Sequence, residues 1–271
     1  FHVIRVNQNL CPEWVHFFVR QPRVLRAAMT HFTGAVGQQR VPEGFLANLE
    51  IPLPPLAEQR RIAAILSEQL AAVDRARAAI EAMLEAAQEL KVAYLQESLS
   101  MSTPRATPLT ECLVEVKDGI GPRWNELPVL GATRDGLASA KEPVGKSPER
   151  YKQVVAGTIF YNPMRILIGS IALVDDGEPT GITSPDYVVF RTRPGILHHR
   201  WFYNWLRSPF GEQFIRSLAR GAVRERILFR RLVTGTVKLP DWSSQCAVAE
   251  QLLNVDRLVR SIQNEITEIS R

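Results

Sequence analysis

The sequence predicts an α+β fold in which β-rich domains alternate with two long, antiparallel coiled-coil helices. Three observations predict this fold: an internal duplication, two apolar stripes with coiled-coil spacing, and a glycine-punctuated stretch of short β-rich segments. The chain has 271 residues and is 45% hydrophobic, which suffices for one large domain or two smaller ones with cores. No apolar run reaches the ~18 residues that a membrane span needs.

The duplication aligns several segments in the same order. Trp14–Arg20 (WVHFFVR) aligns with Trp201–Arg207 (WFYNWLR) at an offset of 187 residues. Glu68–Arg75 aligns with Glu250–Arg257 at an offset of 182, and six of these eight positions are identical. The second copy is thus shorter by about one helical turn. Because its front part starts near Thr103, we expect the first copy to lack the equivalent front part.

Two segments have the composition and spacing of long helices. The first runs from about Leu56 to Leu99 without Gly or Pro, and would extend about 65 Å. Its stripe is broken by Arg77, whereas the stripe of the second helix is regular. We expect the two stripes to pack against each other; the alternative is an ordinary buried face on each helix. The packing residues are Leu66, Leu70, Val73, Ile80 and Leu84 in the first helix, and Val248, Leu252, Val255, Val259, Ile262 and Ile266 in the second.

The region between the helices has a different pattern. β-rich segments are expected at Val154–Phe160, Ile166–Val174 and Tyr187–Arg191, and short helices at His199–Leu206 and Phe210–Leu218. From Val188 to Pro240 there are eleven Lys or Arg against two Glu, a net charge of +9. Such a concentration favours a polyanionic partner, although a solvated basic face is an equally good explanation.

Motifs for catalysis and cofactors are incomplete. Gly145-Lys146-Ser147 lacks the upstream glycine of a phosphate-binding loop, and Asn162-Pro163-Met164-Arg165 lacks the second proline and the aromatic residue of an amino-methyltransferase motif. His198-His199 has no partner at metal-ligand spacing, and three distant cysteines fit buried thiols in a reducing cytoplasm. We therefore expect no catalytic residue, no metal and no cofactor in this chain.

Residues suited to DNA contact are present instead. Asn can pair with adenine and Arg with guanine in the major groove, while hydroxyl groups and clustered Arg suit base edges and phosphates. A structural or solvated role is the alternative for each residue singly. The candidate DNA contacts are Tyr161, Asn162, Arg165, Ser170, Ser184, Tyr187, Arg220, Arg224 and Arg226 in the second copy, and Gln38, Gln39 and Arg40 in the first.

The sequence resembles the specificity subunits of type I restriction–modification systems. Leu53–Ala63 (LPPLAEQRRIA) resembles the start of that family's long helix, and Gly37–Val41 resembles the segment before it. Tyr161–Arg165 with Gly169-Ser170, and Ser184–Tyr187, resemble one class of its target recognition domains. The second helix start, Leu239–Gln245, lacks the second Pro and the Glu of the pattern.

The resemblance implies a DNA-binding specificity subunit for host defence. It implies a bipartite double-stranded DNA target, with paired helices that set the spacer between half-sites. It also implies cytoplasmic complexes with methylation subunits, two in number, which bind S-adenosylmethionine, and with restriction subunits. The corresponding parts are the C-terminal part of a first target recognition domain (1–53), a first spacer helix (54–102), a second target recognition domain (103–240) and a second spacer helix (241–271).

Two other function classes stay open at this point. The chain could be a coiled-coil assembly scaffold whose β-rich domains bind protein, with the Arg clusters serving solubility. It could also be a methyltransferase with its own recognition domain, although 271 residues without a cofactor loop disfavour this.

Overall fold

The structure, a computed structural model, describes residues 2–35, 37, 39–101, 103–140, 144–219 and 226–269. The chain divides into two compact units, Phe1–Ala82 and Met83–Arg271. The long helix α4 (Leu56–Met101) contributes to both, so the boundary falls inside it. The four-part division expected from the sequence stays a prediction.

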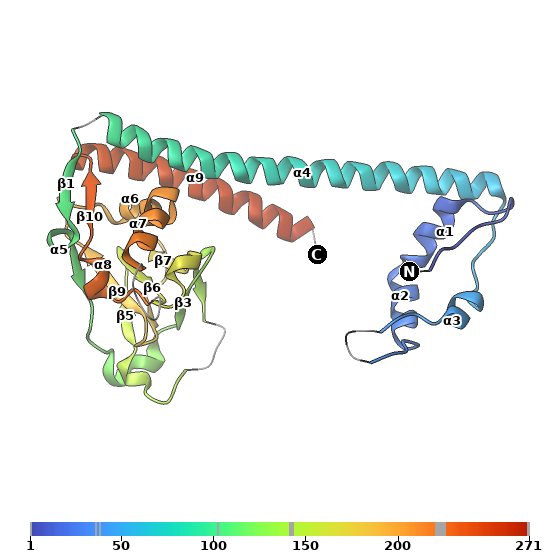
Figure 1. Cartoon of the computed structure of the whole chain (residues 1–271), viewed down its shortest axis with the longest axis horizontal. Coiled ribbons are helices and arrows are strands. Elements are labelled where there is room, and N and C mark those ends of the chain that lie inside the picture. Colours follow the sequence, from blue (N-terminus) through green and yellow to red (C-terminus); the bar gives the residue numbers. More distant parts are fainter. Residues whose placement is uncertain are drawn as a thin grey trace. The chain divides into compact units, whose positions relative to one another are not determined.

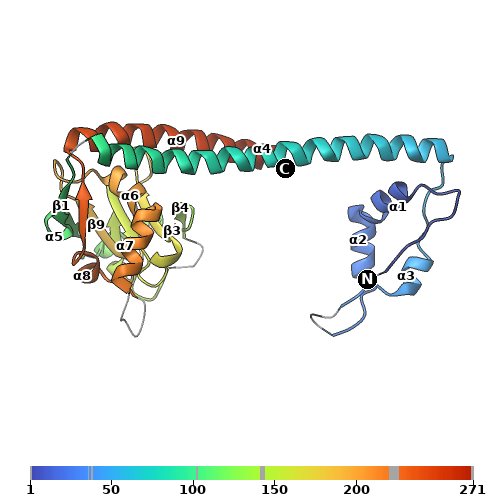
Figure 2. The ribbon, with the colours of Figure 1, turned by 45° about the horizontal axis from the view of Figure 1, so that its top comes forward.

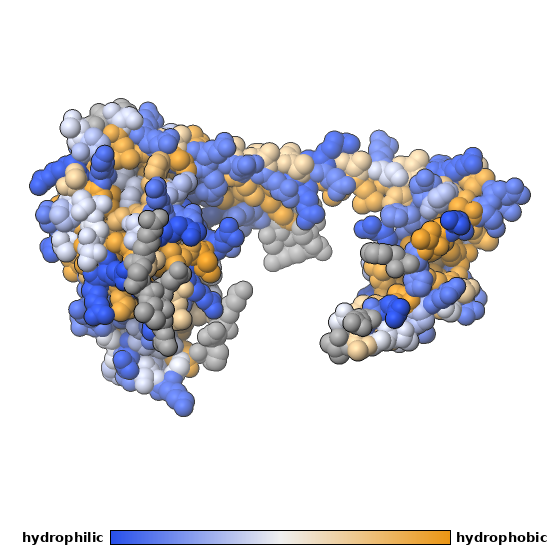
Figure 3. Space-filling model, viewed as in Figure 1, coloured by the Kyte–Doolittle hydropathy of each residue, from blue (hydrophilic) through white to orange (hydrophobic). Residues whose placement is uncertain are grey.

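Unit 1 contains three short helices and the first part of α4. Proline occupies the first position of α1 and of α2, where its missing N–H leaves no helix hydrogen bond unmade. Val15, Phe18 and Val24 are buried, as is Ala63 of α4, and apolar side chains also reach the surface over α1 and α2 (Figure 3). The short helices are α1 (Pro12–Val19), α2 (Pro22–Met29) and α3 (Glu43–Ala47).

Unit 2 contains a four-stranded antiparallel sheet in the order β2-β9-β6-β7, with three strand pairs around it (Figure 1). Both faces of the central strand β6 are covered, so all four of its residues are buried. The strands are β1 (Arg105–Pro108), β2 (Leu113–Glu115), β3 (Leu130–Thr133), β4 (Gly136–Ser139), β5 (Lys152–Val154), β6 (Thr158–Tyr161), β7 (Ile171–Val174), β8 (Gly181–Thr183), β9 (Val188–Thr192) and β10 (Thr236–Leu239). The outer pairs are β1 with β10, β3 with β4 and β5 with β8.

The helices of unit 2 include the two short ones that the sequence predicts, α6 (His199–Arg207) and α7 (Pro209–Ala219). Trp201, Phe202 and Leu206 of α6 are buried in the main core with strand residues of β6, β7 and β9. The other helical segments are α5 (Leu109–Cys112), α8 (Phe229–Leu232) and α9 (Trp242–Ile269), with the short 3-10 helices η1 (Gly121–Glu126), η2 (Pro148–Arg150) and η3 (Ile166–Ile168).

Two β predictions are partly wrong. The segment Val154–Phe160 is not one strand: β5 ends at Val154, β6 begins at Thr158, and residues 155–157 form a turn between them. The segment Ile166–Val174 is extended only over β7, and its first three residues form η3. The 3-10 helix ends at Gly169, whose φ of +82° is a left-handed conformation that favours glycine. The apolar run therefore contains a turn and a strand rather than one long strand.

Within unit 2, the second part of α4 and helix α9 lie side by side and antiparallel (Figures 1 and 2). Lys91 of α4 forms an ion pair with Asp256 of α9. Four residues later in α4 and four residues earlier in α9, Leu95 and Leu252 are both fully buried in the same core. This order of contacts is that of an antiparallel helix pair, as expected.

The predicted packing residues differ in their burial. Val248, Leu252 and Val255 are buried, and the other predicted α9 residues are half-buried, namely Val259, Ile262 and Ile266. In α4, Leu66, Ile80 and Leu84 are half-buried. Leu70 and Val73 are instead 50% and 62% exposed, so their expected packing is wrong for this structure. All residues from 67 to 79 are exposed, because unit 1 packs only on the beginning of the helix. None of the described helices has the length and apolar character to cross a membrane.

Candidate nucleic-acid interface

The turn after β6 (residues 162–170) carries the candidate residues Asn162 and Arg165, and hydrogen bonds within the turn stabilise it. The Asn162 side-chain Oδ1 accepts from the Met164 N–H at 2.9 Å, and the Arg165 N–H donates to the Asn162 carbonyl at 3.0 Å. The Ile168 and Ser170 N–H groups both donate to the Arg165 carbonyl. These hydrogen bonds hold the backbone of the turn in one conformation. The Asn162 Oδ1 already accepts a hydrogen bond, whereas its Nδ2 group can donate to a ligand.

Arg207 of α6 fixes this turn to the neighbouring β3–β4 turn. Its guanidinium donates to the carbonyls of Gly169 and Ile171 at 3.2 and 3.1 Å, and to the carbonyl of Arg134 at 2.6 Å. The Arg207 side chain also lies over the Tyr203 ring at 5.3 Å. The Arg207 guanidinium thus connects two surface loops. Arg134 itself is exposed and lies beside Gly169.

Two of the predicted cations come together at this turn. The N–H of Ile227 donates to the carbonyl of Pro163 at 3.0 Å, which places Arg226 next to Asn162–Arg165. Arg165 and Arg226 are both exposed, and neither forms an ion pair with any residue in the described ranges. The geometry can therefore offer an amide and two guanidinium groups to one ligand.

Two of the predicted DNA contacts are wrong, because their side chains belong to the protein interior. Tyr161 is 0% exposed in the main core, where burial raises the pKa of its hydroxyl above the ordinary value. Ser170 is buried, and its hydroxyl donates to the Ala132 carbonyl at 2.7 Å. Alternation along a strand could not identify the inward face, since both faces of β6 are covered.

The other predicted contacts have various surroundings. Ser184 and Tyr187 lie in the β8–β9 turn, where the Ser184 hydroxyl accepts from the Asp186 N–H and the Tyr187 ring packs on Phe160. In unit 1, Gln39 and Arg40 are exposed, and the Arg40 backbone pairs with Thr33. Arg220, Arg224 and Gln38 lie outside the described residues.

A buried glutamine joins the α+β domain of unit 2 (the sheet with α6 and α7) to the long helix α9, and the sequence analysis missed it. Gln245, in the first turn of α9, is 1% exposed. Its Oε1 accepts from the His198 N–H at the start of α6 at 2.9 Å. Its Nε2 donates to the Pro240 and Ile196 carbonyls at 2.9 and 3.1 Å. One amide therefore satisfies three main-chain groups where the domain meets the helix.

Unit 1 contains the same joint. Gln59, in the first turn of α4, is also 1% exposed. Its Oε1 accepts from the Cys11 N–H at the start of α1 at 2.9 Å, and its Nε2 donates to the Pro54 and Asn9 carbonyls at 2.8 and 3.3 Å. The signal was in the sequence: each glutamine is the fifth residue after the proline of an aligned Leu-Pro pair.

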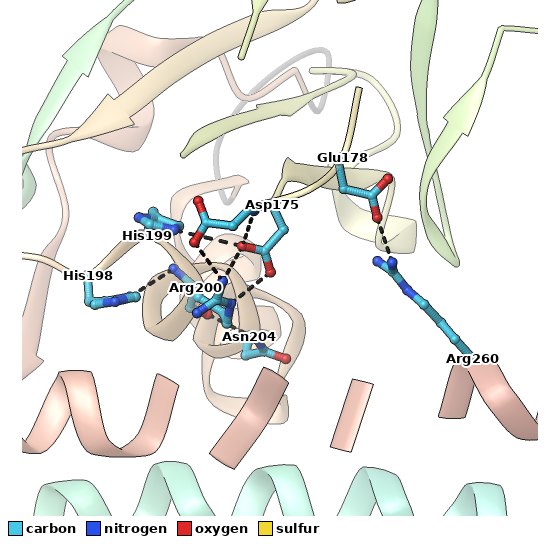
Figure 4. A network of polar contacts seen from close by, with 8 residues as sticks. Asp175, Glu178, His198, His199, Arg200, Asn204 and Arg260 are labelled. Atoms are coloured by element: carbon cyan, nitrogen blue, oxygen red, sulfur yellow. Dashed lines mark hydrogen bonds and ion pairs between the residues drawn. The ribbon is translucent and has the colours of Figure 1, made fainter. Parts of the chain in front are cut away.

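A second set of contacts holds the α+β domain of unit 2 against the long helices α4 and α9. The Trp201 indole N–H donates to the Ser98 hydroxyl of α4 at 3.1 Å. Arg260 of α9 reaches the loop after β7 and binds Glu178 at 2.6 Å (Figure 4). Together with the Gln245 bonds, these contacts attach the domain to α4 and α9 at three separate places.

Beside this joint, three side chains form a group that could in principle hold a cation: Asp175, Asp176 and His199. Arg200 already binds Asp175 through two guanidinium nitrogens and reaches Asp176 at 3.3 Å (Figure 4). Burial raises the pKa of the Asp175 carboxyl, but hydrogen bonds from Arg200 and from the backbone outweigh it and lower the pKa below its ordinary value. The arrangement is that of an ion pair, with the guanidinium in the place of a cation.

Burial lowers the pKa of both adjacent histidines. Burial lowers the pKa of His198 to about 4, and the charges of His199 and Arg200 act in the same direction. Burial also lowers the pKa of His199, against the opposing effect of Asp175. The His198 Nδ1 accepts from the Arg200 N–H at 3.3 Å and so caps α6.

Acidification is expected to destabilise unit 2 before its carboxylates titrate. Below the ordinary histidine pKa of about 6.5, the unfolded chain binds protons that folded His198 and His199 do not, so stability falls as the pH drops from about 6.5 towards 4. The Asp175 contribution is lost only lower, as the pH falls below the ordinary carboxyl range. Thermal melts across this window should show a smaller pH dependence for His198→Asn, which retains a capping oxygen. An equal dependence in both proteins would exclude His198 as a cause.

Comparison with known proteins finds a family match for part of the chain and a shared fold. Residues 1–86 match the family described as "Type I restriction modification DNA specificity domain". The chain is 32% identical over 90 residues to the EcoEI type I restriction enzyme specificity subunit of Escherichia coli, a match that covers 33% of the chain and 15% of that protein. It is 25% identical over 290 residues to the protein named as the MjaX specificity subunit of Methanocaldococcus jannaschii, which covers 99% of the chain and 67% of that protein.

A solved structure shares the fold. The type I restriction–modification S subunit from M. genitalium superposes with a TM-score of 0.57 at 16% identity, over 97% of this chain and 70% of that one. The chain thus spans a small part of its E. coli relative and about two thirds of the longer matches.

Proposed function

Because residues 1–86 match the type I restriction modification DNA specificity domain and the chain resembles specificity subunits, we propose that it is such a subunit, non-catalytic, and that it reads a bipartite sequence in double-stranded DNA. The observation that carries this proposal is the repeated glutamine joint. In each unit, one long helix is joined to the preceding segments by the same three hydrogen bonds, which supports two equivalent readers on one scaffold.

The proposed reading surface of unit 2 is the turn after β6 with its neighbouring loops. Arg165 and Arg226 supply phosphate or guanine contacts, and the Nδ2 group of Asn162 supplies a donor for a base edge. In unit 1, Gln39 and Arg40 occupy an exposed segment suited to the same role. A half-site would thus be read by loops on a rigid domain.

In the proposed complex, methylation and cleavage would be carried out by the partner subunits. Methylation subunits, two in number, would dock on the helices and bind S-adenosylmethionine, and restriction subunits would join them. The exposed stretch of α4 from residue 67 to 79 is available for such docking. We place the complex in the cytoplasm, where chromosomal DNA and reduced thiols coexist; the three cysteines of the chain are free.

The length of α4 is expected to set the spacer between the half-sites. Deleting four residues around Gln69, in the exposed stretch, should remove about one turn and about 6 Å. Sequencing of methylated sites from cells that express the chain with its methylation subunit should then show a spacer shorter by one or two base pairs. A matched variant with four residues replaced by alanine should retain the original spacer. An unchanged spacer after the deletion would contradict the ruler function.

A further inference from the structure

The turn after β6 exposes two large apolar side chains. Met164 and Ile168 are each 66% exposed, more than any other large hydrophobic residue described in unit 2. Between and beside them, Pro163, Ile166 and Ser170 are buried and anchor the turn. A turn that needs only those anchors could carry polar residues at the two exposed positions without loss of packing.

Hydrogen bonds restrain the backbone that carries the two exposed side chains. Hydrogen bonds within the turn join Arg165 to both Asn162 and Ser170, and the Ile171 N–H donates to the Gly169 carbonyl at 2.8 Å. Arg207 holds the same end of the turn through two carbonyls. Rigid display of apolar groups lowers the entropic cost of inserting them into a partner.

Three arginines lie on or next to the same turn. Arg165 lies between them in sequence, Arg226 adjoins Pro163, and Arg134 adjoins Gly169. All three guanidinium groups are exposed, and none has an ion-pair partner among the residues that the structure describes. An apolar centre with a cationic rim complements a nucleic-acid duplex, in which apolar base stacks lie between rows of phosphates. A protein partner would have to bring carboxylates to match three arginines.

We propose that Met164 and Ile168 form an apolar wedge that enters between base pairs of the half-site read by unit 2, while Arg134, Arg165 and Arg226 contact the flanking phosphates. This proposal rests on the DNA-reading function proposed above and specifies how one half-site is recognised. Insertion of Met or Ile side chains unstacks a base step and bends the duplex. The half-site should then favour an easily unstacked pyrimidine–purine step at the wedge, which is specificity without a hydrogen bond to the base.

The test compares the full chain bound to its methylation subunit with the same complex carrying Met164→Ser and Ile168→Ser. Affinity for the methylated-site duplex is measured by fluorescence anisotropy at several salt concentrations, and unstacking by 2-aminopurine placed at each step in turn. We expect the double variant to bind roughly 10- to 100-fold more weakly. The salt slope should be unchanged, because no phosphate contact is lost, and the 2-aminopurine signal at one step should disappear.

Val114→Thr is the matched control, since Val114 is also an exposed apolar residue of unit 2; it should bind like the unmodified chain. Unchanged affinity and an unchanged 2-aminopurine signal in the double variant would overturn the wedge. Normal DNA affinity with lost binding of the methylation subunit would overturn it too, and would assign the patch to that protein. If the unmodified complex binds no duplex, the DNA-reading function itself falls. If only Arg165→Ala weakens binding, that function stands without the wedge.

Discussion

Replacing Gln245 with leucine is expected to destabilise unit 2 by about 3 kcal/mol, because one N–H and two carbonyls lose the partner that this buried side chain supplies. For a unit of this size, the melting temperature should fall by roughly 6–12 °C. Thermal melts followed by near-ultraviolet circular dichroism would measure the change. The matched control is Gln251→Leu, because Gln251 is exposed on the same helix and should change stability by no more than about 0.5 kcal/mol.

A glutamate at position 245 separates the two halves of this joint. Gln245→Glu retains an oxygen that can accept from the His198 N–H, but it cannot donate to the Pro240 and Ile196 carbonyls. Its stability should lie at or below that of the leucine variant, since a carboxylate would face two carbonyl oxygens. Equal melting temperatures for Gln245→Leu and Gln251→Leu would contradict the joint.

Replacing Arg165 and Arg226 together with alanine should weaken DNA binding roughly 10- to 100-fold near physiological salt. The slope of log affinity against log salt concentration should become shallower by about 2, one for each lost phosphate contact. Fluorescence anisotropy of the complex on its methylated-site duplex at several salt concentrations would measure both quantities. The change in slope distinguishes this variant from the apolar double variant, for which only the intercept moves.

The control for this prediction removes the same charge elsewhere. Arg193 and Arg257 are exposed residues of unit 2 that lie outside the turn. Their double alanine variant should show a much smaller loss of affinity through the general field of the protein. Equal losses in the two double variants would show that net charge, rather than the turn after β6, determines affinity.

The sequence predicted the long-range organisation of the fold well. The long helices, α6 and α7, and the antiparallel helix pair of unit 2 followed from composition, helical spacing and the duplication. Helical periodicity is a strong signal over 28 or 46 residues, because many side chains report the same face. Short strands with both faces buried give no such signal.

Individual side chains of the candidate site were predicted less well. Tyr161 and Asn162 are neighbours in the motif from which DNA contacts were predicted. Tyr161 lies in the core, whereas Asn162 lies in a surface turn. The break is a local turn whose position depends on Gly169 and on Arg207, a residue about 40 positions later. Gln59 and Gln245 were missed for the opposite reason: a polar residue in a first helical turn indicates solvent, unless the main-chain groups around it are known.

The glutamine joint contacts only main-chain atoms on the domain side. The same three bonds form with cysteine and asparagine in unit 1 and with histidine and isoleucine in unit 2. The attachment therefore places no demand on the side chains of the segment it holds. A domain of different sequence that offers the same N–H and carbonyl groups would form the same bonds. Side-chain substitutions in the attached segments can therefore change the surface of the domain without changing these three hydrogen bonds.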